Sequence, residues 1–150
     1  MKKLIVLISA ALMLSANVLF ASPYETTVNN KINSTFNESF TGATDVKWYT
    51  EDNKTFTAKF TMSNTKVTAF FKEDGTLLAT SRYLQGDQLP LRVLSKLNKK
   101  YSNSSIYCVV EYASSENVVY FVTLESTDTW TVIKTDAEAN MKVYSRLKKA

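Results

Sequence analysis

Apolar residues recur along this chain with two different periods, and each change of period marks an expected boundary between elements. A period of four predicts a helix over about residues 25–40, because residues four apart lie on one stripe of a helix. The residues of this stripe are Val28, Ile32, Phe36 and Phe40. A second stripe predicts a helix that begins after Pro90, where a helix tolerates a missing N–H. Its residues include Val93, Leu97 and Tyr101.

A period of two predicts strands that bury one face. The pattern is clearest where Phe56, Ala58, Phe60 and Met62 alternate with polar residues. Further strands are expected over residues 66–72, 76–83, 106–113, 118–125, 130–134 and 141–147. Gly75 lies in the turn between two of these strands, where glycine adopts a positive φ at no steric cost.

The second half of the chain repeats the pattern of the first at an offset of about 64 residues. Phe56 is matched by Tyr120, and Arg82 is matched by Arg146. A pattern that recurs at a fixed offset is typical of one supersecondary unit used twice. We therefore predict an α+β fold with a tandem duplication of a helix plus four antiparallel strands, forming one antiparallel sheet of about eight strands with helices on one face. The opposite face of this sheet is expected to be open to water or to a partner.

The first 21 residues have the three parts of a secretory signal peptide. Lys2 and Lys3 precede an apolar run, and a segment that ends at Ala21 follows it. A membrane-spanning helix is the alternative, but polar residues interrupt a stretch already near the lower length limit for spanning a bilayer. We expect cleavage after Ala21, a periplasmic or secreted protein, and no stable membrane insertion after cleavage.

The mature chain, residues 22–150, is expected to form a single domain. No proline-rich linker or change of composition separates its two halves, which would be repeats over about residues 22–85 and 86–150. The formal net charge of the whole chain is +4, and loss of Lys2 and Lys3 with the signal lowers it by two. So small a charge removes the main electrostatic argument for nucleic-acid binding.

Composition excludes most catalytic chemistry. The chain has no histidine and one cysteine, which rules out catalytic triads, imidazole acid–base catalysis, His-containing zinc sites and thiolate clusters. Glu51 with Asp52 and Glu73 with Asp74 lie in expected turns, where solvated carboxylates are more common than calcium sites or glycosidase pairs. We therefore expect no enzyme, no cofactor and no bound metal.

Aromatic side chains are the remaining candidates for a binding function. Alternation assigns Phe36, Phe56, Phe60, Phe71, Tyr120 and Trp130 to the helix side of the sheet. It assigns the candidate partner-binding residues to the open face: Phe70, Tyr107, Phe121, Tyr144, Lys59 and Lys66. Rigid aromatic side chains beside lysines suit a protein-binding surface. Ordinary cross-strand pairing, which also favours aromatics, is the alternative explanation.

Three short stretches carry a family resemblance. They are Val46 with Lys47 and Trp48, residues 69–75, and Leu89 with Pro90. With these stretches and the order of its elements, the chain resembles the PepSY-like family of secreted beta-lactamase-inhibitor-like proteins of Bacteroidetes. The resemblance implies a non-catalytic periplasmic or secreted protein whose concave antiparallel sheet binds another protein. It implies no inhibitory residues, because no motif in the chain matches an inhibitory loop.

These observations lead to two alternative functions. We expect an exported, non-catalytic binding module that binds or inhibits another periplasmic or extracellular protein through the open face of its sheet. The alternative is a periplasmic small-ligand carrier or envelope-stress protein that holds an apolar molecule between sheet and helices. A carrier of this kind needs a cavity on the order of several hundred Å³.

Overall fold

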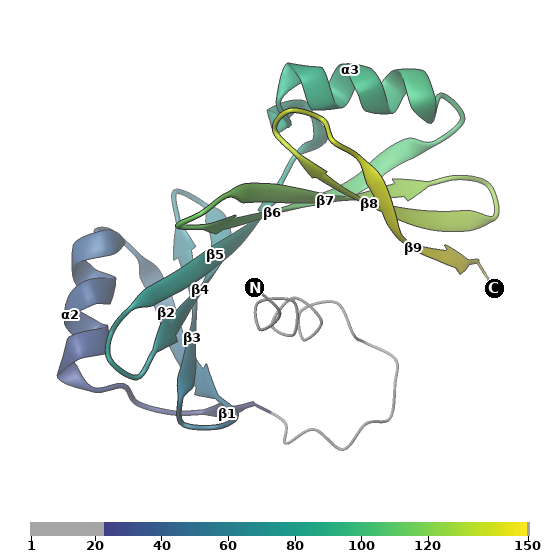
Figure 1. Ribbon diagram of the computed structural model, residues 1–150. Coiled ribbons are helices and arrows are strands. Elements are labelled where there is room, and N and C mark those ends of the chain that lie inside the picture. The colour runs from purple at the N-terminus through teal and green to yellow at the C-terminus, as the bar shows by residue number, and fades with distance from the viewer. Residues whose placement is uncertain (1–22, 150) are drawn as a thin grey trace.

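The computed structural model describes residues 23–149, which form one antiparallel sheet of nine strands with two α-helices (Figure 1). The strands are β1 (Tyr24–Glu25), β2 (Thr44–Thr50), β3 (Thr55–Met62), β4 (Thr65–Lys72), β5 (Leu77–Leu84), β6 (Ser105–Ser114), β7 (Val118–Glu125), β8 (Thr129–Asp136) and β9 (Lys142–Lys148). The helices are α2 (Asn30–Ser39), α3 (Leu91–Lys100) and the short 3₁₀ helix η1 (Gly86–Gln88). Each strand pairs with the next one in sequence, so the sheet is a meander.

The predicted tandem duplication of a helix plus four strands is wrong. The sheet has nine strands rather than about eight, because β1 adds an edge strand in which Tyr24 lies opposite Thr50 and Glu25 opposite Tyr49. The two helices also begin differently, since Asn29 caps α2 whereas a 3₁₀ helix and a proline precede α3. The fold is mostly antiparallel sheet, and α+β only in the broad sense. The repeated apolar spacing reflects a local requirement common to both halves, namely an apolar helix stripe packed on alternating strands.

The start of α2 is fixed to the turn between β4 and β5. Oδ1 of Asn29 accepts a hydrogen bond from the N–H of Ile32 at 3.0 Å, which satisfies one free amide of the first helical turn. Nδ2 of Asn29 donates to the carbonyl oxygen of Glu73 at 2.9 Å. In the same turn Gly75 has φ +89°, and a Cβ at this position would lie 3.1 Å from the backbone of Lys31. Any other residue would be strained at this φ and would push the turn and the helix apart by a few tenths of an ångström.

Two separate hydrophobic clusters hold the helices against the sheet. The cluster under α2 consists of Ile32, Phe36, Phe56, Ala58, Phe60, Ala69 and Phe71. The cluster under α3 consists of Leu89, Val93, Leu97, Val109, Tyr120, Val122, Leu124, Ile133 and Ala139. Side chains of these clusters occupy the space between helices and sheet, where the small-ligand alternative would place its ligand.

Both helices lie on the same side of the sheet. Directly paired residues share a face, and one such row runs through Val67, Arg82, Glu111 and Tyr120. Val67 packs against the cluster under α2, whereas Tyr120 belongs to the cluster under α3. The sheet bends so that the helices lie on its outer side (Figure 1). No helix of residues 23–149 covers the inner side, which we call the open face.

The assignment of Trp130 to the helix side is wrong. Trp130 pairs with Glu125, whereas its neighbour Thr131 pairs with Leu124 of the cluster under α3. Trp130 therefore lies on the open face. The misassignment has a physical reason, because β8 carries apolar residues on both faces and alternation alone cannot set the register of such a strand.

The expected signal peptide, residues 1–21, lies outside the described residues, and its cleavage after Ala21 stays a prediction. The extent of the single domain, residues 22–150, also stays a prediction. Within residues 23–149, no helix is long and apolar enough to cross a membrane.

Candidate functional site on the open face

Three pairs of aromatic side chains lie on the open face, with ring centroids between 4.6 and 6.3 Å apart. The pairs are Phe70 with Tyr112, Phe121 with Tyr144, and Tyr107 with Trp130. Tilted and edge-to-face contacts at these distances are favourable, because the ring edge is positive and the ring face is negative. The structure thus brings two predicted residues, Phe121 and Tyr144, into contact. It adds Tyr112 and Trp130, which sequence reasoning missed.

The signals for the two missed aromatics are weak. Tyr112 follows Glu111, which pairs with Arg82 on the helix side, so alternation would place Tyr112 on the open face once that pairing is known. The sequence does not show which residues of β5 and β6 are opposite each other. For Trp130, the sequence does not show the register of β8 against β7, which decides its face.

β-Bulges place two of the predicted tyrosines on this face. The pairing of β6 with β7 shifts between Ile106 and Cys108, which leaves Tyr107 as an extra residue in the strand. The pairing of β8 with β9 shifts in the same way and leaves Tyr144 as the extra residue. A bulge bends its strand and turns a side chain in a new direction. Both tyrosines therefore reach neighbouring aromatics while 66% and 43% of their surfaces, respectively, stay exposed.

Phe121 lies on the open face but is only 4% exposed. The ring of Tyr144 covers it from β9, and Nζ of Lys134 lies 5.6 Å from its ring centroid. The buried ring of Phe121 therefore supports the more exposed ring of Tyr144, an arrangement that limits the motion of Tyr144.

The two predicted lysines lie on the open face near the β3–β4 turn. Nζ of Lys59 lies 5.1 Å from the ring centroid of Tyr49. Nζ of Lys66 donates a hydrogen bond to Oγ1 of Thr61 at 2.8 Å. Both lysines are exposed, so their charges are available to a partner.

The predicted site residues thus form two groups rather than one row. Lys59, Lys66 and Phe70 lie on β3 and β4, and Tyr107, Phe121 and Tyr144 lie on β6, β7 and β9. Strand β5 separates the two groups, and Tyr112 on β6 links them by its contact with Phe70. Burial of the Tyr112 phenol raises its pKa above the usual value of 10.0.

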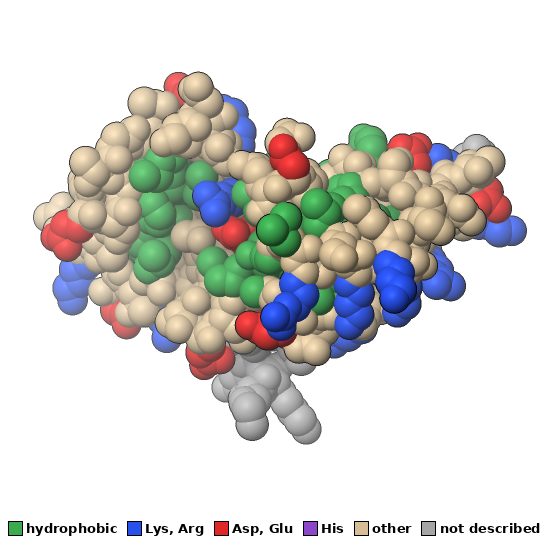
Figure 2. All heavy atoms as spheres, turned by 90° about the horizontal axis from the view of Figure 1, so that it is seen from above, with side chains coloured by type: hydrophobic (Ala, Val, Ile, Leu, Met, Phe, Trp, Pro, Cys, Tyr) green, Lys and Arg blue, Asp and Glu red, His purple; other side chains and the backbone are tan. Residues whose placement is uncertain are grey.

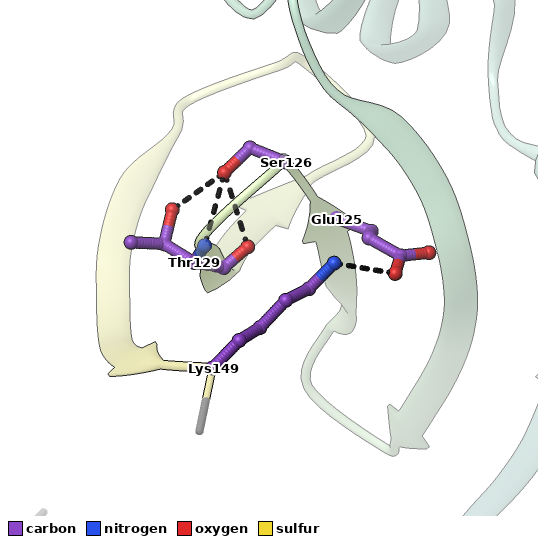
Figure 3. Close-up of polar contacts among 4 residues, drawn as sticks. All are labelled: Glu125, Ser126, Thr129 and Lys149. Atoms are coloured by element: carbon purple, nitrogen blue, oxygen red, sulfur yellow. Dashed lines mark hydrogen bonds and ion pairs between the residues drawn. The ribbon is translucent and has the colours of Figure 1, made fainter.

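An ion pair lies at the β9 end of the open face (Figure 3). Nζ of Lys149 is 2.6 Å from Oε1 of Glu125 and 4.8 Å from the ring centroid of Trp130. In the adjoining β7–β8 turn, Oγ of Ser126 donates to the carbonyl oxygen of Thr129 at 3.2 Å and accepts from its N–H at 3.2 Å. The Ser126–Thr129 contacts close the turn, and the ion pair holds Lys149 against the sheet and occupies the Glu125 carboxylate.

A depression of about 580 Å³ lies beside this ion pair. Its lining comes from residues 102–105 and 125–127 and from Lys149, and these side chains are polar or charged. A lining of this kind provides little apolar contact and does not suit the apolar ligand of a small-ligand carrier.

A second surface lies on the helix side, where Figure 2 shows a hollow between the parts of the molecule that carry α2 and α3. On this side Nε of Arg82 lies 2.6 Å from Oε1 of Glu111, joining β5 to β6. The hydrogen bond to Glu111 raises the pKa of Arg82. Burial of Tyr120, which pairs with Glu111, raises the pKa of that phenol. Because Arg82 and Glu111 neutralise each other, this ion pair adds no net charge to the surface.

Two of the acidic turn residues, Asp52 and Asp74, accept hydrogen bonds from the backbone. Oδ1 of Asp52 accepts hydrogen bonds from the N–H groups of Lys54 and Thr55 at 2.9 and 2.8 Å. Burial by itself raises the pKa of Asp52, but these backbone hydrogen bonds outweigh it and leave the pKa below its usual value. In the described part of the chain, no group of three or more cysteine, aspartate or glutamate side chains is placed to hold a metal ion.

No family model matches the sequence, and no curated protein matches it. Solved structures do match. A DUF2874 family protein from Bacteroides ovatus has a TM-score of 0.68 at 17% identity, over 82% of this chain and 89% of that chain. A BLIP-like protein from Bacteroides fragilis has a TM-score of 0.64 at 16% identity, over 82% and 87%. A protein from Bacteroides eggerthii, described as a candidate periplasmic protein, has a TM-score of 0.68 at 12% identity, over 82% and 90%.

These comparisons establish a shared fold, since all identities are below one fifth. The expected likeness to beta-lactamase-inhibitor-like proteins of Bacteroidetes is confirmed at the level of fold. None of the comparisons shows the PepSY-like relationship.

Proposed function

We propose that this protein is an exported, non-catalytic module that binds another protein in the periplasm or outside the cell, and that it does so through the open face. The observation that carries the proposal is the set of three aromatic pairs on a sheet face that no described helix covers. Exposed Tyr107 and Tyr144 each pack against a second ring. Aromatic residues held in this way are typical anchors of protein interfaces, because they bury a large area and lose little conformational freedom.

The fold likeness supports the same class of function. A BLIP-like protein and a candidate periplasmic protein share this architecture with the chain. Fold alone does not determine function, so the side chains of the open face carry the proposal.

The chemistry of the face favours binding over catalysis. Cys108, the single cysteine of the chain, lies on the open face beside Thr123, with 3.8 Å between Sγ and Oγ1. A hydroxyl group does not activate a thiol as a base or a cation would. The remaining residues of the face are aromatic and aliphatic side chains, threonines, serines and lysines, together with three carboxylates.

Affinity capture with a matched control variant tests the proposal. The full-length chain is expressed and exported, and the purified protein is incubated with an envelope extract of the same organism. Tyr107→Glu combined with Tyr144→Glu places two charges on the open face. Leu91→Glu is the control, because Leu91 is 81% exposed on α3, on the other side of the sheet.

We expect the wild type and Leu91→Glu to retain the same proteins and the double variant to lose them. Circular dichroism and thermal melting verify that all three proteins are folded. Retention of an unchanged set of proteins by the folded double variant would show that the open face is not the binding surface.

A further inference from the structure

Two pairs of lysines lie directly opposite each other on the open face. Lys47 of β2 is opposite Lys59 of β3, and Lys134 of β8 is opposite Lys142 of β9. Like charges at directly opposite positions of neighbouring strands destabilise a sheet. Two such pairs therefore carry a cost for folding, which a negatively charged partner would remove on binding.

The carboxylates on this face do not neutralise the lysine pairs. Among the described residues the ion pairs are Arg82 with Glu111 on the helix side and Lys149 with Glu125 (Figure 3). Asp136 accepts two hydrogen bonds from Asn140, one from its backbone N–H at 2.9 Å and one from Nδ2 at 2.8 Å.

The remaining charges on the face are mostly positive. Register places Lys66 and Lys72 of β4 on the open face with the lysine pairs. The third carboxylate of this face, after Glu125 and Asp136, is Glu25, which lies in the two-residue edge strand β1. The open face therefore carries six lysines besides Lys149 and three carboxylates. One of these carboxylates, Glu125, is already paired with Lys149. The open face carries an excess of positive charge although the net charge of the chain is small.

The two lysine pairs lie at opposite ends of the face. Five strand-to-strand spacings separate β3 from β8, which corresponds to about 24 Å. On β5, β6 and β7 the residues that face this side include no lysine or arginine, and their aromatic members are Tyr83, Tyr107, Tyr112 and Phe121. An aromatic centre with charged ends on this scale resembles the core and rim of a protein–protein interface.

We infer that the partner of the open face is an acidic protein, whose carboxylates bind the lysine pairs at the two ends and whose apolar surface contacts the aromatic centre. This inference rests on the proposed function and adds the chemical class of the partner. A single-stranded nucleic acid matches the face less well, because its phosphates need a continuous positive groove. A lipid bilayer also matches less well, because a flat surface does not fill the inner side of a bent sheet (Figure 1).

Titration with poly-L-glutamate tests the inference. The exported protein, produced from the full-length chain, is titrated with this acidic polypeptide at about 50 mM and about 300 mM NaCl, conditions that differ strongly in charge screening. Lys47→Glu combined with Lys134→Glu puts a carboxylate opposite Lys59 and another opposite Lys142. Because each substitution turns a like-charge pair into an opposite-charge pair, the variant is expected to fold.

The control is Arg92→Glu combined with Lys99→Glu, which makes the same change of net charge on the exposed side of α3. We expect the lysine-pair variant to bind poly-L-glutamate at least about tenfold more weakly than the wild type, and the control to differ by less than about threefold. Raising the NaCl concentration from about 50 mM to about 300 mM should also weaken wild-type binding about tenfold.

Equal weakening in the two double variants would overturn the inference, because net charge alone would then explain the binding. The absence of wild-type binding, or tighter binding of single-stranded DNA or phosphatidylglycerol vesicles, would overturn it as well. The capture experiment separates this failure from failure of the proposed function. Proteins that the lysine-pair variant retains and the Tyr107–Tyr144 double variant loses would refute an acidic partner and leave the open face as the binding surface.

Discussion

The ring of Tyr144 packs edge to face on the ring of Phe121, with 5.2 Å between the centroids and 81° between the planes. The contact joins β9 to β7 across β8. Phe121 is 4% exposed and Tyr144 is 43% exposed, so a buried ring supports an accessible one. A side chain that is already ordered in the free protein loses less entropy when a partner binds.

Truncation of this pair should lower the stability of the fold. We expect Tyr144→Ala to reduce the free energy of unfolding by about 1 kcal/mol, since an aromatic pair contributes beyond its buried area. Tyr83→Ala is the matched control, because Tyr83 is a 65% exposed tyrosine of the same face. Urea denaturation of both variants gives the comparison, and equal losses of stability would contradict a specific Phe121–Tyr144 contribution.

Substitution of Gly75 should destabilise the fold more than substitution of Gly42, although both glycines have a positive φ. Gly75 has φ +89° and a Cβ there would lie 3.1 Å from the backbone of Lys31, whereas Gly42 has φ +86° and nothing within 4 Å. Both alanine substitutions strain the backbone, but only Gly75→Ala also forces α2 away from the turn. We expect Gly75→Ala to cost more than about 1 kcal/mol and Gly42→Ala to cost clearly less. The midpoints of urea unfolding measure both effects, and the reverse order would disprove the close packing of turn and helix.

The Arg82–Glu111 ion pair should contribute modestly to stability. Half of the Arg82 side chain is exposed, and solvent screens the charge of an exposed group. A double-mutant cycle with Arg82→Gln and Glu111→Gln should give a coupling energy of about 0.5–1 kcal/mol that decreases at high salt. A coupling energy that is insensitive to salt would show that electrostatic attraction is not its source.

The β8–β9 turn should make stability depend on pH in the acidic range. Hydrogen bonds from the backbone and side-chain amides of Asn140 lower the pKa of Asp136 below the usual 3.8. A carboxyl group with a lower pKa in the folded state contributes stability above its unfolded pKa and loses this contribution as the pH falls through the folded pKa. Wild-type stability should therefore decrease from about pH 5 to about pH 3, and the Asp136→Asn variant should decrease less. Identical urea-unfolding profiles against pH would contradict this role of Asp136.

The sequence predicted the local elements well because their signals are local. The stripe of Ile32 and Phe36 predicts α2, although the helix is shorter than the predicted residues 25–40 because Asn29 caps it. The alternation of Phe56, Ala58 and Phe60 predicts β3 and its buried side. Strand β1 has only two residues, which is too short for any periodic pattern, and it exists through its pairing with β2.

The arrangement of the elements and of the site depended on register, which alternation does not determine. The bulges at Tyr107 and Tyr144 and the placement of Trp130 follow from pairing between strands. The opposition of Lys134 to Lys142 has the same origin. The duplication was inferred from spacing alone, and spacing cannot distinguish a repeated unit from a meander whose two halves both bury a helix.

The most direct test of binding through the open face is site-specific photo-crosslinking in living cells. A photoreactive amino acid replaces Tyr107 or Tyr144 on the open face, and Leu91 on α3 serves as the reference position. We expect discrete crosslinked products with another protein from positions 107 and 144 and none from position 91. Products from position 91 alone, or none from positions 107 and 144, would contradict binding through the open face.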